Sequence, residues 1–141
     1  MHDKYFIDTN ILIYCHDEGQ PTKKERALAL LSDALQNKNG MISWQVVQEF
    51  LHVATRKFAV PLKNEDAMVY LQKVLSPLCQ IQPNLEIYQQ SILLMKEVGY
   101  SFYDSLILAA ALHGGCNIIY TEDLKHGQMI HTMRILNPFS E

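Results

Sequence analysis

Hydrophobic and polar positions alternate along this chain in a pattern that predicts strands and helices in regular succession. Short apolar runs bounded by turn residues predict strands, and longer amphipathic stretches between them predict helices. The predicted strands are Tyr5–Ile7, Met41–Ser43, Cys79–Gln82, Asn117–Tyr120 and Thr132–Leu136. The predicted helices are Asn10–His16, Lys23–Gln36, Gln45–Lys57, Glu65–Leu75, Asn84–Val98 and Ser105–His113. This alternation indicates one α/β domain, residues 1–141, with three α/β/α layers and a central parallel sheet of about five strands.

Residues with special backbone preferences mark the ends of the predicted helices. Thr22 and Asn64 are the predicted N-caps of the second and fourth helices, because their side chains can accept a backbone N–H. The pair Asn39-Gly40 is a stop signal after the second helix, and Gly99 is one after the fifth. Pro77 is predicted to end the fourth helix, because proline lacks the N–H that a helix interior needs.

A polar trio, Asp8-Thr9-Asn10, separates the first predicted strand from the first predicted helix. In an α/β fold, ligands bind at the carboxyl ends of the strands. Asp8 is therefore a candidate for chemistry. Capping of the following helix explains an Asp at this position equally well.

Glu49 and Asp104 are two further candidates, each on a predicted helix. Glu49 stands between Val46 and Val53, at the edge of an apolar stripe, although an exposed helix face is the usual place for a Glu. Asp104 comes three residues after Ser101, which is the spacing of a capping box. The helix that follows Asp104 is apolar almost all round and is therefore predicted to be buried. Capping and catalysis are compatible at Asp104.

Asp123 repeats the pattern of Asp8. It follows a short apolar strand through Thr121 and Glu122, although Thr-Glu-Asp is also ordinary loop chemistry. If the two strands are parallel neighbours in one sheet, Asp8 and Asp123 emerge side by side. The four acids then form one site.

Four clustered carboxylates require a positive partner. Each close pair repels by about 1 kcal/mol in water and about 4 kcal/mol at an effective dielectric of 20. A divalent cation such as Mg²⁺ prefers oxygen ligands, whereas zinc would favour His or Cys. The single Glu49-x-x-His52 spacing is half of what a di-iron carboxylate site needs. The acids therefore predict a hard divalent metal.

These residues, in this order, resemble the acidic pattern of PIN-domain nucleases. The segment Tyr120–Gly127 is similar to the subgroup that includes the VapC-type toxins of toxin–antitoxin pairs, and the resemblance covers Lys4 to Pro138. It implies a metal-dependent endoribonuclease that carries Mg²⁺ or Mn²⁺ between four acids, with three polar residues in supporting positions. The acids are Asp8, Glu49, Asp104 and Asp123, and the supporting residues are Thr9, Asn10 and Thr121. The resemblance also implies a homodimer and a cognate antitoxin.

The net charge of −3 is a point against nucleic-acid binding, which normally leaves a basic footprint. Two basic clusters soften this point, although clusters of this length are more typical of solvated helix faces. Their basic residues are Lys23, Lys24 and Arg26 in the first cluster and Arg56 and Lys57 in the second. We therefore expect RNA to be bound through local contacts rather than through the overall charge of the protein. The sequence leaves open which of these basic residues take part.

Composition predicts a cytoplasmic domain with a substantial core. The chain has 141 residues, 48% of them hydrophobic, and its longest apolar run, Leu106–Leu112, is far too short to span a bilayer. The N-terminus shows no signal-like region. The cysteines Cys15, Cys79 and Cys116 are odd in number and lack a CxxC spacing, which predicts reduced thiols.

Two other functions fit parts of the pattern. An aspartyl-phosphate hydrolase also places its nucleophile after the first strand, but it has a second acid two residues later, where this chain has Asn10. A PIN-like domain that has lost catalysis and acts through protein partners is the other alternative. Metal-dependent RNA cleavage that is lost on substitution of Asp8 separates the nuclease from that binding module.

Overall fold

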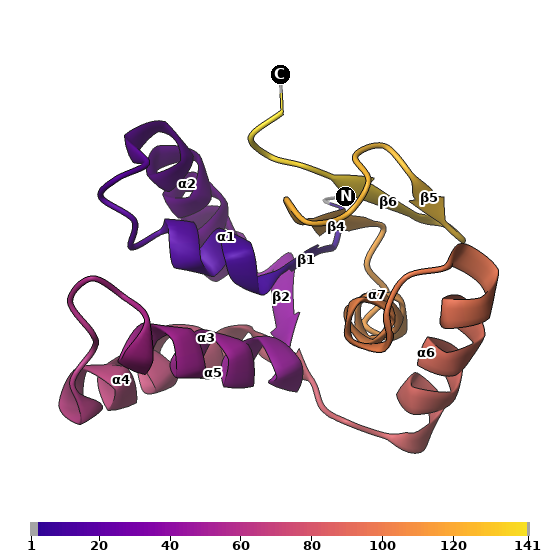
Figure 1. Ribbon diagram of the computed structural model, residues 1–141, viewed down its shortest axis with the longest axis horizontal. Helices are drawn as coiled ribbons and strands as arrows, with labels where there is room; N and C mark the ends of the chain where they lie inside the picture. The colour runs from indigo at the N-terminus through magenta and orange to yellow at the C-terminus, as the bar shows by residue number, and fades with distance from the viewer. Residues whose placement is uncertain (1–2, 141) are drawn as a thin grey trace.

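The computed structural model describes residues 3–140 and contains one sheet of six strands in the order β3-β2-β1-β4-β6-β5 (Figure 1). The strands are β1 (Tyr5–Ile7), β2 (Gly40–Ser43), β3 (Cys79–Ile81), β4 (Ile118–Tyr120), β5 (Met129–Ile130) and β6 (Met133–Leu136). All neighbouring strands run parallel except β5 and β6, which are antiparallel. The predicted parallel sheet is confirmed, with one additional short strand, β5, at its edge.

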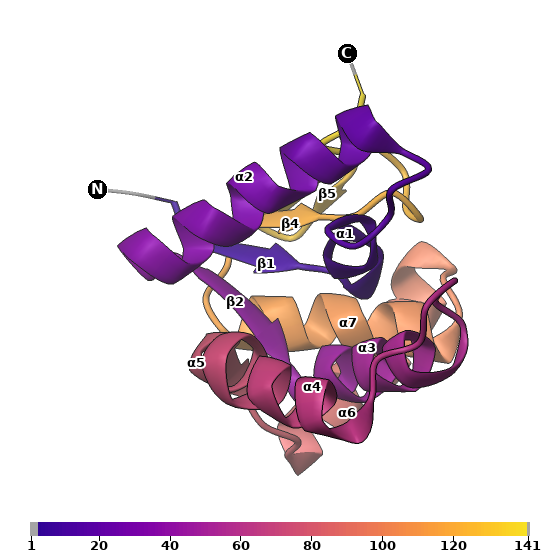
Figure 2. The same ribbon diagram turned by 90° about the vertical axis from the view of Figure 1, so that its left-hand side faces the viewer.

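Helices cover both faces of this sheet, which confirms the three-layer architecture. The helical elements are α1 (Thr9–Tyr14), α2 (Pro21–Asn37), α3 (Trp44–Arg56), α4 (Asn64–Tyr70), the π-helical turn η1 (Leu71–Leu75), α5 (Ser76–Leu78), α6 (Leu85–Val98) and α7 (Phe102–His113). Figure 2 shows α2 on one side of β1 and β4 and α7 on the other. The α1 helix follows directly from the carboxyl end of β1.

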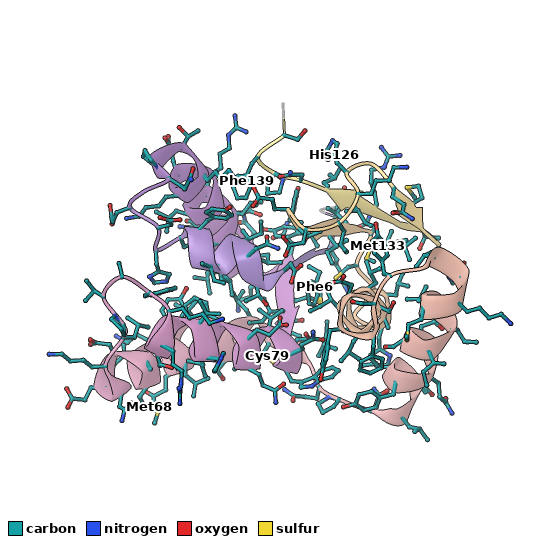
Figure 3. The ribbon with its side chains drawn as sticks, in the orientation of Figure 1. Phe6, Met68, Cys79, His126, Met133 and Phe139 are labelled. Atoms are coloured by element: carbon teal, nitrogen blue, oxygen red, sulfur yellow. The ribbon has the colours of Figure 1, made fainter. Side chains whose placement is uncertain are left out.

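The core lies between the sheet and the helices that cover it. Every residue of β1 is buried, and so is the run from Ser105 to Ala111 in α7, as its apolar sequence predicted. Figure 3 shows Phe6 and Met133, both fully buried, in the centre of the molecule, whereas Met68 points outward from α4. The site described below therefore rests on rigid, buried elements.

Two predicted N-caps are wrong. The α2 helix begins at Pro21, so that Thr22 lies inside it, and the α4 helix begins at Asn64 after the cap residue Lys63. Neither helix has a side-chain cap. Proline suits the first position of a helix, because its φ is already helical and its missing N–H is not needed there.

The end of α2 uses different residues from those predicted. Lys38, with φ 58°, adopts the left-handed conformation that ends the helix. Gly40 is instead the first residue of β2, where a Cβ would lie 2.5 Å from the Cβ of Ala34 and 2.6 Å from the Tyr5 ring. The glycine is therefore required by close packing rather than by a turn. At the end of α6, by contrast, Gly99 has φ 80° and closes the helix as predicted.

The predicted stop at Pro77 is wrong. The chain continues from α4 through the π-helical turn η1 into α5, which ends at Leu78. The wider π-helical turn lies immediately before the segment with Pro77, where the regular hydrogen-bond ladder is interrupted by the missing N–H.

Two predictions from composition can be compared with the structure. Cys15 and Cys116 are buried free thiols, and Cys79 is a half-buried one, as expected for reduced cysteines. Within residues 3–140, no helix combines the length and the apolar character needed to cross a lipid bilayer.

Candidate active site

The strands β1 and β4 bring two of the predicted acids to one edge of the sheet. They are parallel neighbours, with Ile7 opposite Tyr120. The Asp8 N–H donates to the Tyr120 carbonyl at 3.0 Å, so that the polar residues after each strand begin side by side. The predicted juxtaposition of the Asp8 and Asp123 segments is therefore present.

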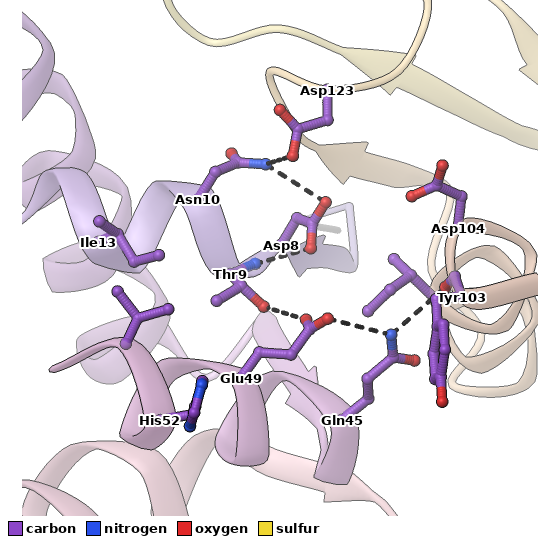
Figure 4. Close-up of a pocket in the computed structure, with 12 residues that line it drawn as sticks. Asp8, Thr9, Asn10, Ile13, Gln45, Glu49, His52, Tyr103, Asp104 and Asp123 are labelled. Atoms are coloured by element: carbon purple, nitrogen blue, oxygen red, sulfur yellow. Dashed lines mark hydrogen bonds between the residues drawn. The ribbon is translucent and has the colours of Figure 1, made fainter. Parts of the chain in front are cut away.

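All four predicted acids line one pocket of about 290 Å³ (Figure 4). They come from four separate segments: the end of β1, the middle of α3, the first turn of α7 and the loop after β4. The residues that line the pocket are Asp8, Thr9, Asn10, Ile13, Gln45, Glu49, His52, Val53, Tyr103, Asp104, Ile107 and Asp123.

Asp8 is the most buried of the four acids, with 9% of its surface exposed. Its Oδ1 accepts the Thr9 N–H at 2.7 Å, which is the predicted helix cap. Its Oδ2 accepts the Thr121 hydroxyl at 2.8 Å and the Asn10 amide at 3.4 Å. Asp8 therefore caps α1 and faces the pocket at the same time.

Burial raises the pKa of Asp8 to about 6. Hydrogen bonds from Thr121 and from the Thr9 backbone oppose this shift, whereas the charges of Glu49 and Asp123 add to it. The raised pKa of Asp8 thus reflects mainly its burial, with a smaller contribution from the two neighbouring acids.

Glu49 lies at the edge of the buried face of α3, as its apolar neighbours predicted. Its Oε1 accepts the Thr9 hydroxyl at 2.6 Å. Its Oε2 accepts the Gln45 amide at 3.4 Å, and the same amide nitrogen donates to the Tyr103 carbonyl at 3.3 Å. Gln45 thus connects α3 to the start of α7.

Sequence reasoning missed Gln45. It is 4% exposed, and its position one helical turn before Glu49 is the signal that could have identified it, because side chains four residues apart share a helix face. A buried Gln beside a candidate catalytic Glu is expected to orient the carboxylate.

Asn10 connects the first acid to the last. Its amide donates to Asp123 Oδ2 at 3.0 Å and to the Thr121 hydroxyl at 3.2 Å. Its carbonyl oxygen accepts the Glu122 N–H at 3.2 Å, which fixes the loop after β4. The three residues predicted to support the acids all take part in this network.

Asp104 faces the pocket from the side opposite Asn10 (Figure 4). Ser101 caps α7 by accepting the Asp104 N–H at 3.3 Å, as predicted. Within residues 3–140, the Asp104 carboxylate has no hydrogen-bond partner, so the return half of the capping box is not formed. This carboxylate is free to bind a ligand.

The lining of the pocket fits a hard divalent cation. It offers carboxylate, amide and hydroxyl oxygens, and among the described lining residues His52 is the only histidine and no cysteine is present. No three acids, histidines or cysteines of residues 3–140 stand close enough to ligate one ion together.

Much of the first basic cluster is engaged in contacts within the protein. The Lys23 Nζ lies 2.5 Å from Glu122 Oε2 and 4.8 Å from the centre of the Tyr14 ring. Burial alone would raise the pKa of Glu122, but hydrogen bonds from Lys23 and Tyr14 outweigh it and lower the pKa. Lys24 forms an ion pair with Glu18. The Lys23–Glu122 contact holds the loop that carries Asp123, and both lysines are engaged by acids of the protein itself.

Replacing Thr121 with valine is expected to lower the free energy of unfolding by about 1–3 kcal/mol, because it leaves buried polar groups without a partner. The Thr121 hydroxyl is fully buried, donates to Asp8 and accepts from Asn10 and from the Asp123 N–H. Urea unfolding with chelator present measures the change. Thr22→Val, at an exposed position of α2, is the matched control, and an equal loss in both variants would contradict the role of the buried hydroxyl.

Solved structures with the same fold include toxins of toxin–antitoxin complexes. A chain of a toxin–antitoxin complex from Klebsiella pneumoniae superposes with a TM-score of 0.68 and 22% identity, over 98% of this chain and 100% of that chain. A chain of DNA-bound VapBC from Salmonella typhimurium gives 0.66 and 19%, over 95% and 97%. VapC20 from Mycobacterium tuberculosis, described as a sarcin-ricin loop cleaving toxin, gives 0.61 and 17%, over 85% and 92%. At these identities the likeness shows a shared fold.

The sequence also matches a family model. A search among curated proteins finds no match. The model of the PIN domain, in contrast, matches residues 5–129, from β1 to the start of β5. The match includes all four acids of the pocket and confirms the resemblance on which the site was predicted. This protein belongs to the PIN domain family.

Proposed function

We propose that this protein is a metal-dependent endoribonuclease and the toxin of a type II toxin–antitoxin pair. The observation that carries the proposal is the convergence of four acids from four separate segments on one pocket, at the carboxyl ends of β1 and β4. Such a cluster is electrostatically unfavourable unless a cation fills it. Membership of the PIN domain family and the shared fold with toxins support the proposal.

Asp8, Glu49, Asp104 and Asp123 would hold Mg²⁺ or Mn²⁺ and are the proposed catalytic residues. When bound, the metal supplies a Lewis acid that activates water and stabilises charge on the phosphoryl group. Thr121 and the Thr9 backbone hold the Asp8 carboxylate in place. The Thr9 hydroxyl and Gln45 hold Glu49. These hydrogen bonds orient the Asp8 and Glu49 carboxylates.

The alternatives are less well supported. In an aspartyl-phosphate hydrolase the position of Asn10 would carry an acid, whereas here its amide donates to Asp123 and Thr121. A PIN-like module without catalysis would need no acids, yet the pocket carries four of them. The experiment that tests the proposal is cleavage of RNA by the purified protein with Mg²⁺ or Mn²⁺, compared with cleavage in chelator.

A cognate antitoxin is the proposed protein partner, in the cytoplasm. A second cavity of about 450 Å³ adjoins the acidic pocket and shares Ile13 and Val53 with it. Its rim includes Val60, which is 82% exposed. Apolar antitoxin segments can cover this surface of the early helices, while the negative potential of the neighbouring pocket attracts a basic side chain.

We expect the antitoxin to inhibit by placing an Arg or Lys at or beside the acids, and Arg suits this role because its planar fork pairs with carboxylates. Alanine substitution of that residue should restore nuclease activity in the mixed complex. If every basic residue of the antitoxin can be replaced without loss of inhibition, the inhibitor acts by occlusion elsewhere. Light scattering on the free toxin and on the complex also checks the proposed homodimer.

A further inference from the structure

Tyr103 places a largely exposed aromatic ring at the rim of the acidic pocket. It is the second residue of α7, directly before Asp104, and 67% of its surface is exposed although it lines the pocket. Gln45 holds its carbonyl at 3.3 Å, and its ring packs edge to face on Phe102 with the ring centres 5.4 Å apart. The backbone and one edge of the ring are thus fixed, while most of the ring remains open to a ligand (Figure 4).

The charge around the acidic pocket favours an RNA contact that does not depend on charge alone. The pocket itself carries four acids, and the net charge of the chain is −3. Lys23 and Lys24, which could otherwise bind phosphates, form ion pairs with Glu122 and Glu18. Arg56 and Lys57 form no ion pair within residues 3–140 and could still bind phosphates, so a contact that is not ionic would add to theirs.

Stacking is the contact that an exposed ring can supply. Unpaired bases stack on aromatic side chains in single-stranded nucleic-acid sites, at about 1–3 kcal/mol per base. Bases inside a duplex are already stacked and cannot make this contact. The ring lines the same pocket as the four acids, beside Gln45, although its side chain and that of Asp104 point in different directions (Figure 4).

We propose that Tyr103 stacks on an unpaired nucleobase of the RNA at the rim of the acidic pocket. The inference rests on the proposed nuclease function and adds a specificity-determining residue to it. The ring, rather than the hydroxyl, makes the contact. Within residues 3–140 the Tyr103 hydroxyl has no hydrogen-bond partner, so its removal should cost nothing in the free protein.

The test compares Tyr103→Ala and Tyr103→Phe with the wild-type protein on an unstructured RNA. Tyr103→Ala should raise KM by about 10-fold or more, as expected for the loss of one stacked base, and leave kcat within about twofold. Tyr103→Phe should keep the wild-type KM. Tyr88→Ala is the matched control, because it removes a part-exposed ring that does not line the pocket. On a fully paired RNA duplex, the Tyr103→Ala and wild-type proteins should cleave equally poorly.

A wild-type KM for Tyr103→Ala would overturn the proposal, and so would an equal loss in Tyr103→Phe, which would assign the contact to the hydroxyl. Binding of a labelled oligonucleotide, measured by fluorescence anisotropy with Ca²⁺ in place of Mg²⁺, provides a readout that does not depend on cleavage. If RNA binding requires the Tyr103 ring but the protein cleaves no RNA, the proposed nuclease function is wrong and the stacking proposal stands. If the protein cleaves RNA with a KM that does not depend on Tyr103, the stacking proposal is wrong and the nuclease function stands.

Discussion

Replacing Asp8 with asparagine is expected to slow RNA cleavage by a factor of about 100 or more, because a metal supplies several kcal/mol to the transition state. Asp8 is the buried acid at the centre of the hydrogen-bond network. Its carboxylate accepts hydrogen bonds from the Thr121 hydroxyl, the Asn10 amide and the Thr9 backbone N–H. Asparagine has nearly the same shape but loses the charge that would hold the cation. Initial rates on one RNA, with Mg²⁺ in excess, measure the effect.

The fold should survive this substitution. Asp8→Asn removes a buried charge whose pKa is already raised to about 6, so the metal-free variant should melt no lower than the wild-type protein by more than a few degrees. Asp66→Asn, at an exposed position of α4 outside the pocket, is the matched control and should cleave at the wild-type rate. Full activity in folded Asp8→Asn protein would remove Asp8 from the catalytic site.

Adding Mg²⁺ or Mn²⁺ is expected to raise the melting temperature by about 10 °C when the free metal exceeds its Kd by about 100-fold, since binding to the native state alone contributes about 2.7 kcal/mol. The reason is electrostatic. Asp8, Glu49, Asp104 and Asp123 line one pocket, where a bound cation would offset the repulsion between their like charges. Thermal unfolding across millimolar metal concentrations, against the same buffer with chelator, measures the shift.

Asp123→Asn should separate the repulsion between the acids from the stabilisation by bound metal. Asp123 is exposed, and its Oδ2 accepts a hydrogen bond from the Asn10 amide at 3.0 Å. An asparagine at this position can keep that hydrogen bond while it removes one negative charge. Its melting temperature in chelator should equal or exceed that of the wild-type protein, and its response to metal should be smaller. Asp66→Asn again serves as the control. Identical melting in metal and in chelator for the wild-type protein would mean that the four acids form no metal site.

The elements that carry the site could be predicted because their signals are local. Tyr5–Ile7 is a strand with the predicted bounds, since a fully buried apolar run followed at once by polar residues has few other interpretations. The cap at Ser101 and the burial of α7 are likewise encoded within a dozen residues. The alternation of strands and helices predicts a parallel sheet but not its strand order. The pairing of β1 with β4, which brings Asp8 and Asp123 together, was therefore a condition of the predicted site, and the structure meets it.

The remaining features depend on contacts between distant parts of the chain, which periodicity does not report. The β5 strand is two residues long and exists only through its antiparallel pairing with β6. Lys23 belonged to a cluster that is typical of a solvated helix face, yet the packing of α2 brings it to Glu122, almost one hundred residues away in sequence. The sequence places Gln45 on the same helix face as Glu49, but its hydrogen bond to the Tyr103 carbonyl depends on the packing of α7 beside α3.

Metal-dependent cleavage of RNA by the wild-type protein is the measurement that tests the central claim most directly. One RNA should be incubated with the purified protein in Mn²⁺, in chelator, and in chelator followed by an excess of Mn²⁺. We predict cleavage in the first sample, none in the second and restored cleavage in the third, with Asp8→Asn slower than the wild-type protein by about 100-fold or more. Cleavage that persists in chelator, or that Asp8→Asn performs at the wild-type rate, would contradict the assignment of this pocket as a metal-dependent nuclease site.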